Sequence, residues 1–227
     1  MVKKQDKTEG GIVAVEEALS KSERFIEQNQ KLLTIIIGAI VIVVLIFFAF
    51  KRFYMAPKEQ EVKEQMFMAE RYFEIDSLNL ALNGDGMYPG FLEVIDDYGM
   101  TQGANLAEYY AGICYLKMGN FNDAIDHLKS FKAKDHILGP MAKGAIGDAY
   151  MELGQPGKAA EYYSEAASIE DNEFTTPLFL MKAGWTYESQ KDYKKALEAY
   201  EKIKFNFPNT NEGREIDKYI TRVKGLM

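Results

Sequence analysis

The sequence holds little of the chemistry on which enzymes and metalloproteins depend. Its 227 residues include one cysteine and two histidines. The single cysteine, Cys114, excludes an intramolecular disulfide. Neither His127 nor His136 has a carboxylate, cysteine or second histidine at the spacing of a zinc site or a catalytic triad. We therefore expect no catalytic residue, no metal site and no cofactor, with His127 on the surface and Cys114 in the core.

Strand signals and phosphate-binding loops are missing as well. No stretch alternates apolar and polar residues over strand length, and no hairpin dipeptide separates two β-branched runs. Without strands, no glycine-rich loop can join a strand to a helix as phosphate sites require. Residues 83–86 lack the alternating oxygen ligands and closing glutamate of a calcium loop. The sequence predicts an all-α protein that is not an enzyme.

The chain also lacks an excess of positive charge. The formal charge of −7 falls entirely in residues 51–227, which carry 21 basic and 28 acidic residues. Residues 1–31 carry six of each and are neutral. Because an acidic domain repels phosphate backbones, nucleic acid is not an expected partner. No small-molecule substrate is expected either.

One run has no charge at all: residues 32–50, LLTIIIGAIVIVVLIFFAF. At about 1.5 Å per residue it is roughly 28 Å long as a helix, close to the hydrocarbon thickness of a bilayer. A core helix of this length usually has a polar stripe, and a signal peptide has a shorter apolar region. The run therefore predicts a single transmembrane helix. Three basic residues before it and four after it do not decide its orientation.

The N-terminal segment, residues 1–31, contains a short amphipathic pattern over residues 10–29. Ile12, Val15, Leu19 and Ile26 recur at helical spacing, with glutamates between them. This pattern is typical of a helix that binds a partner or lies on a membrane surface, or of a weakly ordered tail. The neutral charge of the segment argues against strong lipid adsorption.

Three regions follow the span. Residues 58–98 are expected to form a divergent first helical pair, with one helix over 58–82, a stop at 83–86 and a second helix over 89–98. Residues 105–208 contain three repeated units. Residues 209–227 are expected to form a C-terminal capping helix that begins with an Asn209/Glu212 capping box.

The repeats are visible as three columns with periods of 35 and 37 residues. A glycine, a tyrosine three residues later and an alanine twelve residues after the glycine recur in each unit. A small residue lets two antiparallel helices approach closely, and an aromatic side chain fills the adjacent groove. This pattern resembles the tetratricopeptide repeat, a helix–turn–helix unit whose neighbours stack to bury their apolar faces. The columns are Gly112, Gly147 and Gly184; Tyr115, Tyr150 and Tyr187; and Ala124, Ala159 and Ala196.

In repeats of this type the first helix of each unit lines a groove. By column, this groove is rich in methionine and aromatic residues, which suits a surface that accepts varied apolar segments. The alternative is that half of these residues only pack against the next helix. The predicted protein-binding residues are Tyr109, Ile113, Leu116, Met141, Asp148, Met151, Leu178, Met181, Trp185 and Glu188, with Leu106 and Glu152 beside them.

A short N-terminal segment, one uncharged span and a small repeat domain together resemble the YfgM-like family, ancillary subunits of the bacterial SecYEG translocon. The stretch that begins at Met66 (MFMAERYFEIDSLNLALNGDG) and residues 105–112 (NLAEYYAG) are similar to the tetratricopeptide-repeat form of these proteins in Bacteroidota. The resemblance implies a single-pass inner (cytoplasmic) membrane protein with a cytoplasmic N-terminus and periplasmic repeats. It implies translocon subunits, periplasmic chaperones or client chains as partners.

Two functions remain open at this point. The first is an accessory factor near the translocon that assists envelope protein transport or chaperone hand-off. The second is a structural or regulatory scaffold of another cell-envelope complex.

Overall fold

The computed structural model describes residues 6–133 and 135–227, with side chains from Phe25 onward except Ile26 and residue 134. The chain divides into two compact units, Met1–Pro57 and Lys58–Met227.

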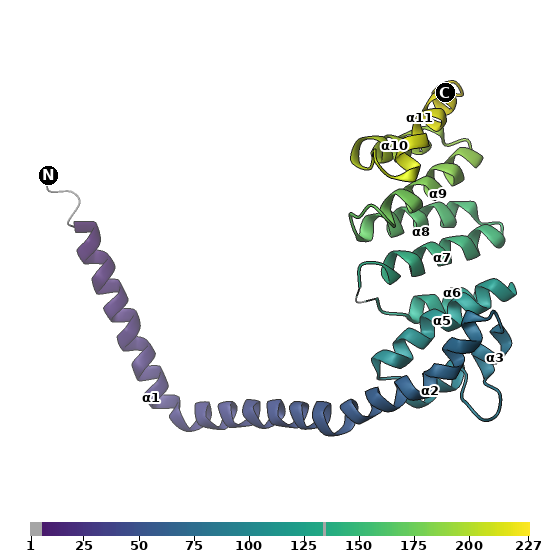
Figure 1. Cartoon of the computed structure of the whole chain (residues 1–227). Helices are drawn as coiled ribbons and strands as arrows, with labels where there is room; N and C mark the ends of the chain where they lie inside the picture. Colours follow the sequence, from purple (N-terminus) through teal and green to yellow (C-terminus); the bar gives the residue numbers. More distant parts are fainter. Residues whose placement is uncertain (1–5, 134) are drawn as a thin grey trace. The chain divides into compact units, whose positions relative to one another are not determined.

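The first unit is helical wherever it is described (Figure 1). Helix α1 spans Asp6–Ala49 and continues into a π-helix, η1, over Phe50–Met55. None of residues 32–50 is buried, and this helix is long and apolar enough to cross a membrane. The amphipathic pattern predicted for residues 10–29 falls within α1, but the side chains of Ile12, Val15 and Leu19 lie outside the described residues.

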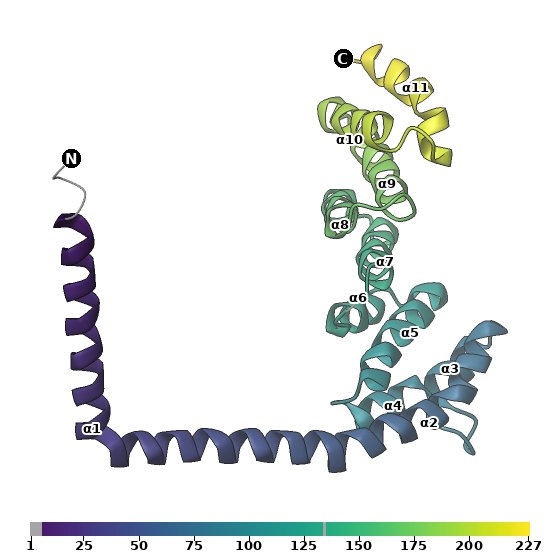
Figure 2. The same cartoon turned by 60° about the vertical axis from the view of Figure 1, so that its left-hand side comes forward.

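The second unit is an array of short helices that follow one another along the chain (Figure 1). Figure 2 shows two layers, with α5, α7 and α9 in one and α6, α8 and α10 in the other. No strand occurs among the described residues. The helices are α2 (Ala56–Glu74), α3 (Leu78–Asn83), α4 (Phe91–Tyr98), α5 (Gln102–Met118), α6 (Phe121–Ser130), α7 (Leu138–Glu152), α8 (Pro156–Ile169), α9 (Thr176–Ser189), α10 (Tyr193–Asn206) and α11 (Asn211–Lys224).

The glycine and alanine columns place the two helices of each pair in close contact. A Cβ built on Gly147 would lie 2.6 Å from the ring of Tyr163, and one on Gly184 would lie 2.2 Å from the ring of Tyr200. Both tyrosines come from the second helix of the same unit, sixteen residues after the glycine. The column alanines of the second helices are fully buried. The small residues therefore set the helix spacing, as predicted. The aromatic rings over Gly147 and Gly184 come from the second helices.

The turn between paired helices also repeats. Gly119, Gly154 and Lys191 each follow a first helix with φ between 63° and 82°. In each turn the following N–H donates to the carbonyl of the column tyrosine five residues earlier, at 2.9 Å. This is the Schellman motif, which satisfies helix-end carbonyls and requires a left-handed residue. Of these three residues, Lys191 is the one that is not a glycine.

The same motif also occurs between α2 and α3, where the sequence pattern predicts one continuous helix. The helix predicted for residues 58–82 is interrupted, because Asp76 has φ 59° and Ser77 N–H donates to the Tyr72 carbonyl at 2.8 Å. Ala69, Tyr72 and Ala81 have the spacing of the glycine, tyrosine and alanine columns, and both alanines are buried. Helices α2 and α3 therefore form the first hairpin, and α4 is an additional helix.

The C-terminal helix begins one residue later than predicted. Thr210, not Asn209, caps α11, since its hydroxyl accepts the Gly213 N–H at 3.1 Å. Ile216, Ile220 and Val223 of this helix are buried in the main core cluster. Helix α11 thus covers the apolar end that the last repeat would otherwise expose.

Candidate protein-binding surface

The candidate surface is the outward side of the layer formed by α5, α7 and α9, called here the first-helix surface. Its residues fall at equivalent positions because the three helices are the first members of successive repeats. Leu106, Met141 and Leu178 occupy one such position, six residues before the column glycine, and all three are half-buried. The surface is therefore neither a core nor a fully hydrated face.

Three of the predicted binding residues line one hollow of about 420 Å³. Leu116 of α5 lies there with Asp148 and Met151 of α7, beside Glu152 and the turn at Gly119. Met151 is exposed, and its sulfur is 3.9 Å from the Thr186 hydroxyl of α9. An exposed, flexible thioether between two repeats can adapt to different apolar groups.

Met181 is a correction to the predicted set. Only 4% of it is exposed, and it belongs to the core cluster that also contains Ile220 of α11. The position three residues before the column glycine is thus internal in the third repeat. In the second repeat the same position is Gly144, where a built Cβ would lie 1.9 Å from the ring of Phe179.

Tyr109, Ile113, Met141 and Leu178 are partly buried and pack against the core. The Tyr109 ring lies 5.4 Å from the ring of Phe131, between centroids. These residues present only an edge to solvent. Their packing role is established by these contacts, and their use by a partner is a proposal.

The two predicted acidic residues are already paired within the protein. Asp148 accepts a hydrogen bond from Tyr163 at 2.6 Å and a salt bridge from Lys182 of the next repeat at 2.7 Å. Burial, followed by the bond to Asp148, raises the pKa of Tyr163. The carboxylate at this position links α7, α8 and α9.

Glu188 and Trp185 contact the C-terminal helix. Arg222 holds both oxygens of Glu188, at 2.7 and 2.8 Å, and Tyr200 donates to the same carboxylate at 3.0 Å. The Trp185 ring lies 6.1 Å from Tyr219, yet 46% of the tryptophan remains exposed. Helix α11 therefore occupies one end of the first-helix surface and leaves Trp185 at its margin.

A second hollow, which the sequence pattern did not reveal, extends the surface toward α2. It has a volume of about 530 Å³ and is lined by Met66 and Glu70 of α2, Leu106 of α5 and Leu138 of α7. Burial, and then the nearby Glu74, raises the pKa of Glu70. The Ala69–Tyr72–Ala81 spacing would have identified α2 as a first helix and thus as part of this surface.

The remaining residues with potentially reactive side chains, Cys114 and His127, have structural roles. Burial raises the pKa of the Cys114 thiol to about 12, so this core residue is not a nucleophile at neutral pH. His127 is half-buried rather than on the surface, because its ring stacks on Tyr115 and its Nδ1 lies 2.6 Å from Glu108. No cluster of three metal-ligating side chains occurs in the part of the chain that is described.

The geometry agrees with the comparison to known families. The family model for the tetratricopeptide repeat matches residues 111–173 and, overlapping them, residues 145–210. The helical repeats of this part of the chain are therefore tetratricopeptide-like. Repeat domains of this type are typically scaffolds for protein–protein interaction. Among curated proteins, no sequence matches the chain.

Two solved structures share the fold. Both are crystal structures of tetratricopeptide-like repeats from a Podosopora anserina protein described as a kinesin light chain. They are 14% and 13% identical to this chain, each with a TM-score of 0.55, and each match covers 74% of this chain and 87% of the other. At this identity the likeness shows the fold alone.

Proposed function

We propose that this protein is a membrane-anchored interaction module whose first-helix surface binds segments of partner proteins. The proposal rests on one observation: the chain has two exposed apolar features of different kinds. One is the uncharged run of residues 32–50, which has no buried residue and is long and apolar enough to cross a bilayer. The other is a repeat surface whose exposed positions are Met151 and Trp185.

We further propose that the partners belong to the protein-export machinery of the cell envelope. The chain would act as an accessory factor near the translocon, with its N-terminus in the cytoplasm and its repeats in the periplasm. Anchoring raises the effective concentration of a weak binding surface near its clients, so modest affinity is sufficient. The resemblance of the segment order to translocon subunits supports this location.

Site-specific photo-crosslinking in membranes tests the surface. A photoreactive phenylalanine analogue at Met151 or Trp185 should capture translocon subunits, periplasmic chaperones or nascent envelope proteins. The matched control is Phe205, an exposed aromatic residue on the second helix α10. Equal capture from Phe205 would contradict the assignment of the surface. Capture of one unrelated assembly would instead favour a scaffold of another envelope complex.

Protease access tests the orientation. The repeat domain should be digested once the outer membrane is permeabilised, while the cytoplasmic membrane is intact. Protection of the domain under these conditions would refute the periplasmic location.

A further inference from the structure

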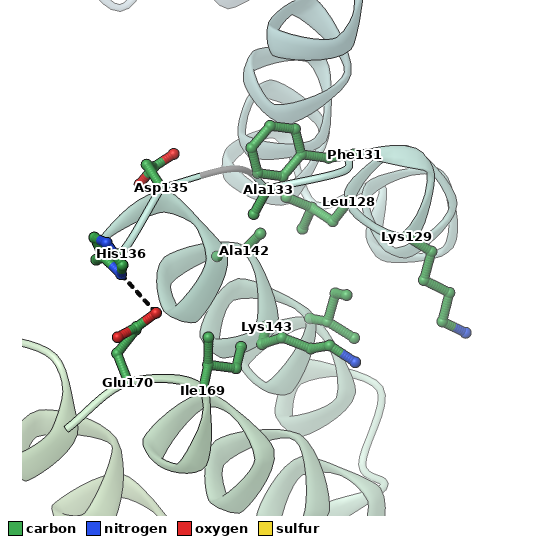
Figure 3. A pocket seen from close by; sticks show the side chains of 12 residues that line it. Leu128, Lys129, Phe131, Ala133, Asp135, His136, Ala142, Lys143, Ile169 and Glu170 are labelled. Atoms are coloured by element: carbon green, nitrogen blue, oxygen red, sulfur yellow. Dashed lines mark ion pairs between the residues drawn. The ribbon is translucent and has the colours of Figure 1, made fainter. Parts of the chain in front are cut away.

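A separate pocket of about 440 Å³ lies beside the second-helix layer (Figure 3). We call it the α6–α8 pocket, because it is bounded by α6, the connection to α7, α7 and the end of α8. Its floor is apolar: Leu128, Ala142 and Ile146 are almost fully buried there, and Ile169 forms part of the wall. The volume and the apolar floor suit one medium-sized aliphatic or aromatic side chain.

A cluster of lysines stands next to this floor. The rings of Tyr150 and Tyr162 stack with centroids 5.3 Å apart. Around them lie the ammonium groups of Lys129, Lys143 and Lys158, each between 5.1 and 5.9 Å from a ring centroid. Lys129 and Lys143 line the pocket itself. Cation–π contacts thus gather positive charge at one side of the pocket, within a domain that is acidic overall.

This positive charge is only partly neutralised. Lys143 pairs with Glu165 at 2.6 Å. No ion pair of Lys129 with a carboxylate occurs in the described part of the chain, and its ammonium group donates to the Tyr150 hydroxyl at 3.4 Å. Lys129 is therefore available to a carboxylate from outside.

The acidic residues of the pocket, in contrast, are already bonded. Glu170 pairs with Nδ1 of His136 at 2.6 Å on the side away from the lysines (Figure 3). The Asp135 carboxylate accepts the backbone N–H groups of Ile137 and Leu138 at the start of α7. The pocket thus has an open cationic side and a satisfied anionic side.

We propose that the α6–α8 pocket binds an acidic segment of a partner protein that carries one apolar side chain. The apolar side chain occupies the floor, and a neighbouring carboxylate pairs with Lys129. This inference rests on the proposed role as a protein-binding module, and it adds a second binding site with its own ligand chemistry.

Fluorescence anisotropy with the full chain in detergent micelles tests the ligand class. The labelled peptide is Gly-Ser-Asp-Glu-Leu-Glu-Asp-Ser-Gly, and the matched peptide has serine in place of leucine. We expect saturable binding of the first peptide, and an affinity about tenfold lower for the second because it buries no side chain. Equal affinities would mean that only general charge attraction holds the peptide, and this would overturn the proposal. The absence of binding up to about 1 mM peptide would also overturn it.

Variants of the chain test the position. Lys129→Met keeps the aliphatic stem and removes the charge, so it should weaken binding about fivefold. Ala133 is exposed and points into the pocket, so Ala133→Trp should obstruct it without disturbing the core (Figure 3). The matched control is Lys194→Met. Lys194 lies on α10 and does not line the α6–α8 pocket, so this variant should leave binding unchanged. Circular dichroism confirms that each variant is folded.

The outcome separates this inference from the proposed function. If Lys129→Met and Ala133→Trp bind the peptide as the original chain does, the pocket assignment is wrong. Crosslinking from Met151 and Trp185 does not involve the pocket. If crosslinking captures the expected partners but the peptide does not bind, only the pocket assignment is refuted. If the peptide binds but crosslinking fails, only the first-helix surface is refuted.

Discussion

Gly184 offers the sharpest test of how the repeats are held together. A Cβ at this position would lie 2.2 Å from Cε1 of Tyr200, where ordinary contact begins at 3.4 Å. The ring would have to move by about 1.2 Å. Tyr200 has no exposed surface, and its hydroxyl donates to Glu188 at 3.0 Å. The ring is therefore closely surrounded, and a shift also strains this partly buried hydrogen bond.

Two opposing effects decide the magnitude of Gly184→Ala. Alanine in a helix interior is more favourable than glycine by about 1 kcal/mol. Overpacking a close-packed core costs about 1–3 kcal/mol, and loss of the hydroxyl bond costs about 1 kcal/mol more. We expect a net loss of about 2 kcal/mol in the free energy of unfolding. For a domain of this size that lowers Tm by about 5 °C.

The assay is urea unfolding followed by two signals. Fluorescence of Trp185, the one tryptophan, reports the third repeat, and far-ultraviolet circular dichroism reports all helices. The control is Gly157→Ala in the first turn of α8, where a built Cβ has no neighbour closer than 3.8 Å. It should be neutral or slightly stabilising. If Gly184→Ala is as stable as Gly157→Ala, close approach at the glycine column does not hold the helices together.

Three further predictions follow from contacts at the helix ends. Lys191→Gly should raise the unfolding free energy by about 0.5–1 kcal/mol, because φ is 63° there, and an unchanged or lower urea midpoint would contradict this. Glu188→Gln should weaken the two bonds to Arg222, lower the free energy of unfolding by about 1 kcal/mol and speed amide hydrogen exchange in α11. Unaltered exchange would show that the pair is dispensable. The hydrogen bond to Glu170 raises the pKa of His136. The pair therefore contributes its full stabilisation below the ordinary histidine pKa, and this stabilisation is lost as pH rises through the raised pKa of His136. Glu170→Gln should return the His136 pKa toward its ordinary value in an NMR titration, and an unshifted curve would exclude this pair as the cause.

The repeat architecture could be predicted because close packing restricts residue type at a few positions. Only a very small side chain fits where Tyr163 or Tyr200 crosses the first helix, and that restriction appears in the sequence as a column. Fully buried alanines such as Ala159 produce a second column for the same reason. The fold class follows from these spacings together with the absence of strand signals.

The sequence pattern does not predict the first hairpin, because its residues at the column positions are less distinctive. Alanine replaces glycine at Ala69, and Asp76 replaces glycine in the left-handed turn, although aspartate adopts that conformation more readily than most residues. A helix prediction based on apolar spacing cannot detect one left-handed residue. The turn becomes visible only when Ala69, Tyr72 and Ala81 are aligned with the later columns.

The exposure of individual site residues depends on neighbours that periodicity does not describe. Met181 and Trp185 lie four residues apart on the same helix, yet the first is buried and nearly half of the second is exposed. Met181 belongs to the core cluster, whereas Trp185 meets the ring of Tyr219 at the margin of α11, and no property of α9 alone specifies these neighbours. The exposure of a repeat-surface residue therefore depends on tertiary neighbours as well as on its position in the repeat.

The paired carboxylates limit how the first-helix surface can recognise a partner. Asp148 is bonded to Lys182 and Tyr163, and Glu188 is bonded to Arg222 and Tyr200. A partner cation would have to compete with these internal partners, and breaking a partly buried pair leaves a charge unsatisfied. Recognition on this surface must then rest mainly on Met151, Trp185 and the edges of half-buried apolar side chains. Such contacts discriminate weakly between apolar segments, which suits the proposed role of an anchored module that meets many clients at high local concentration.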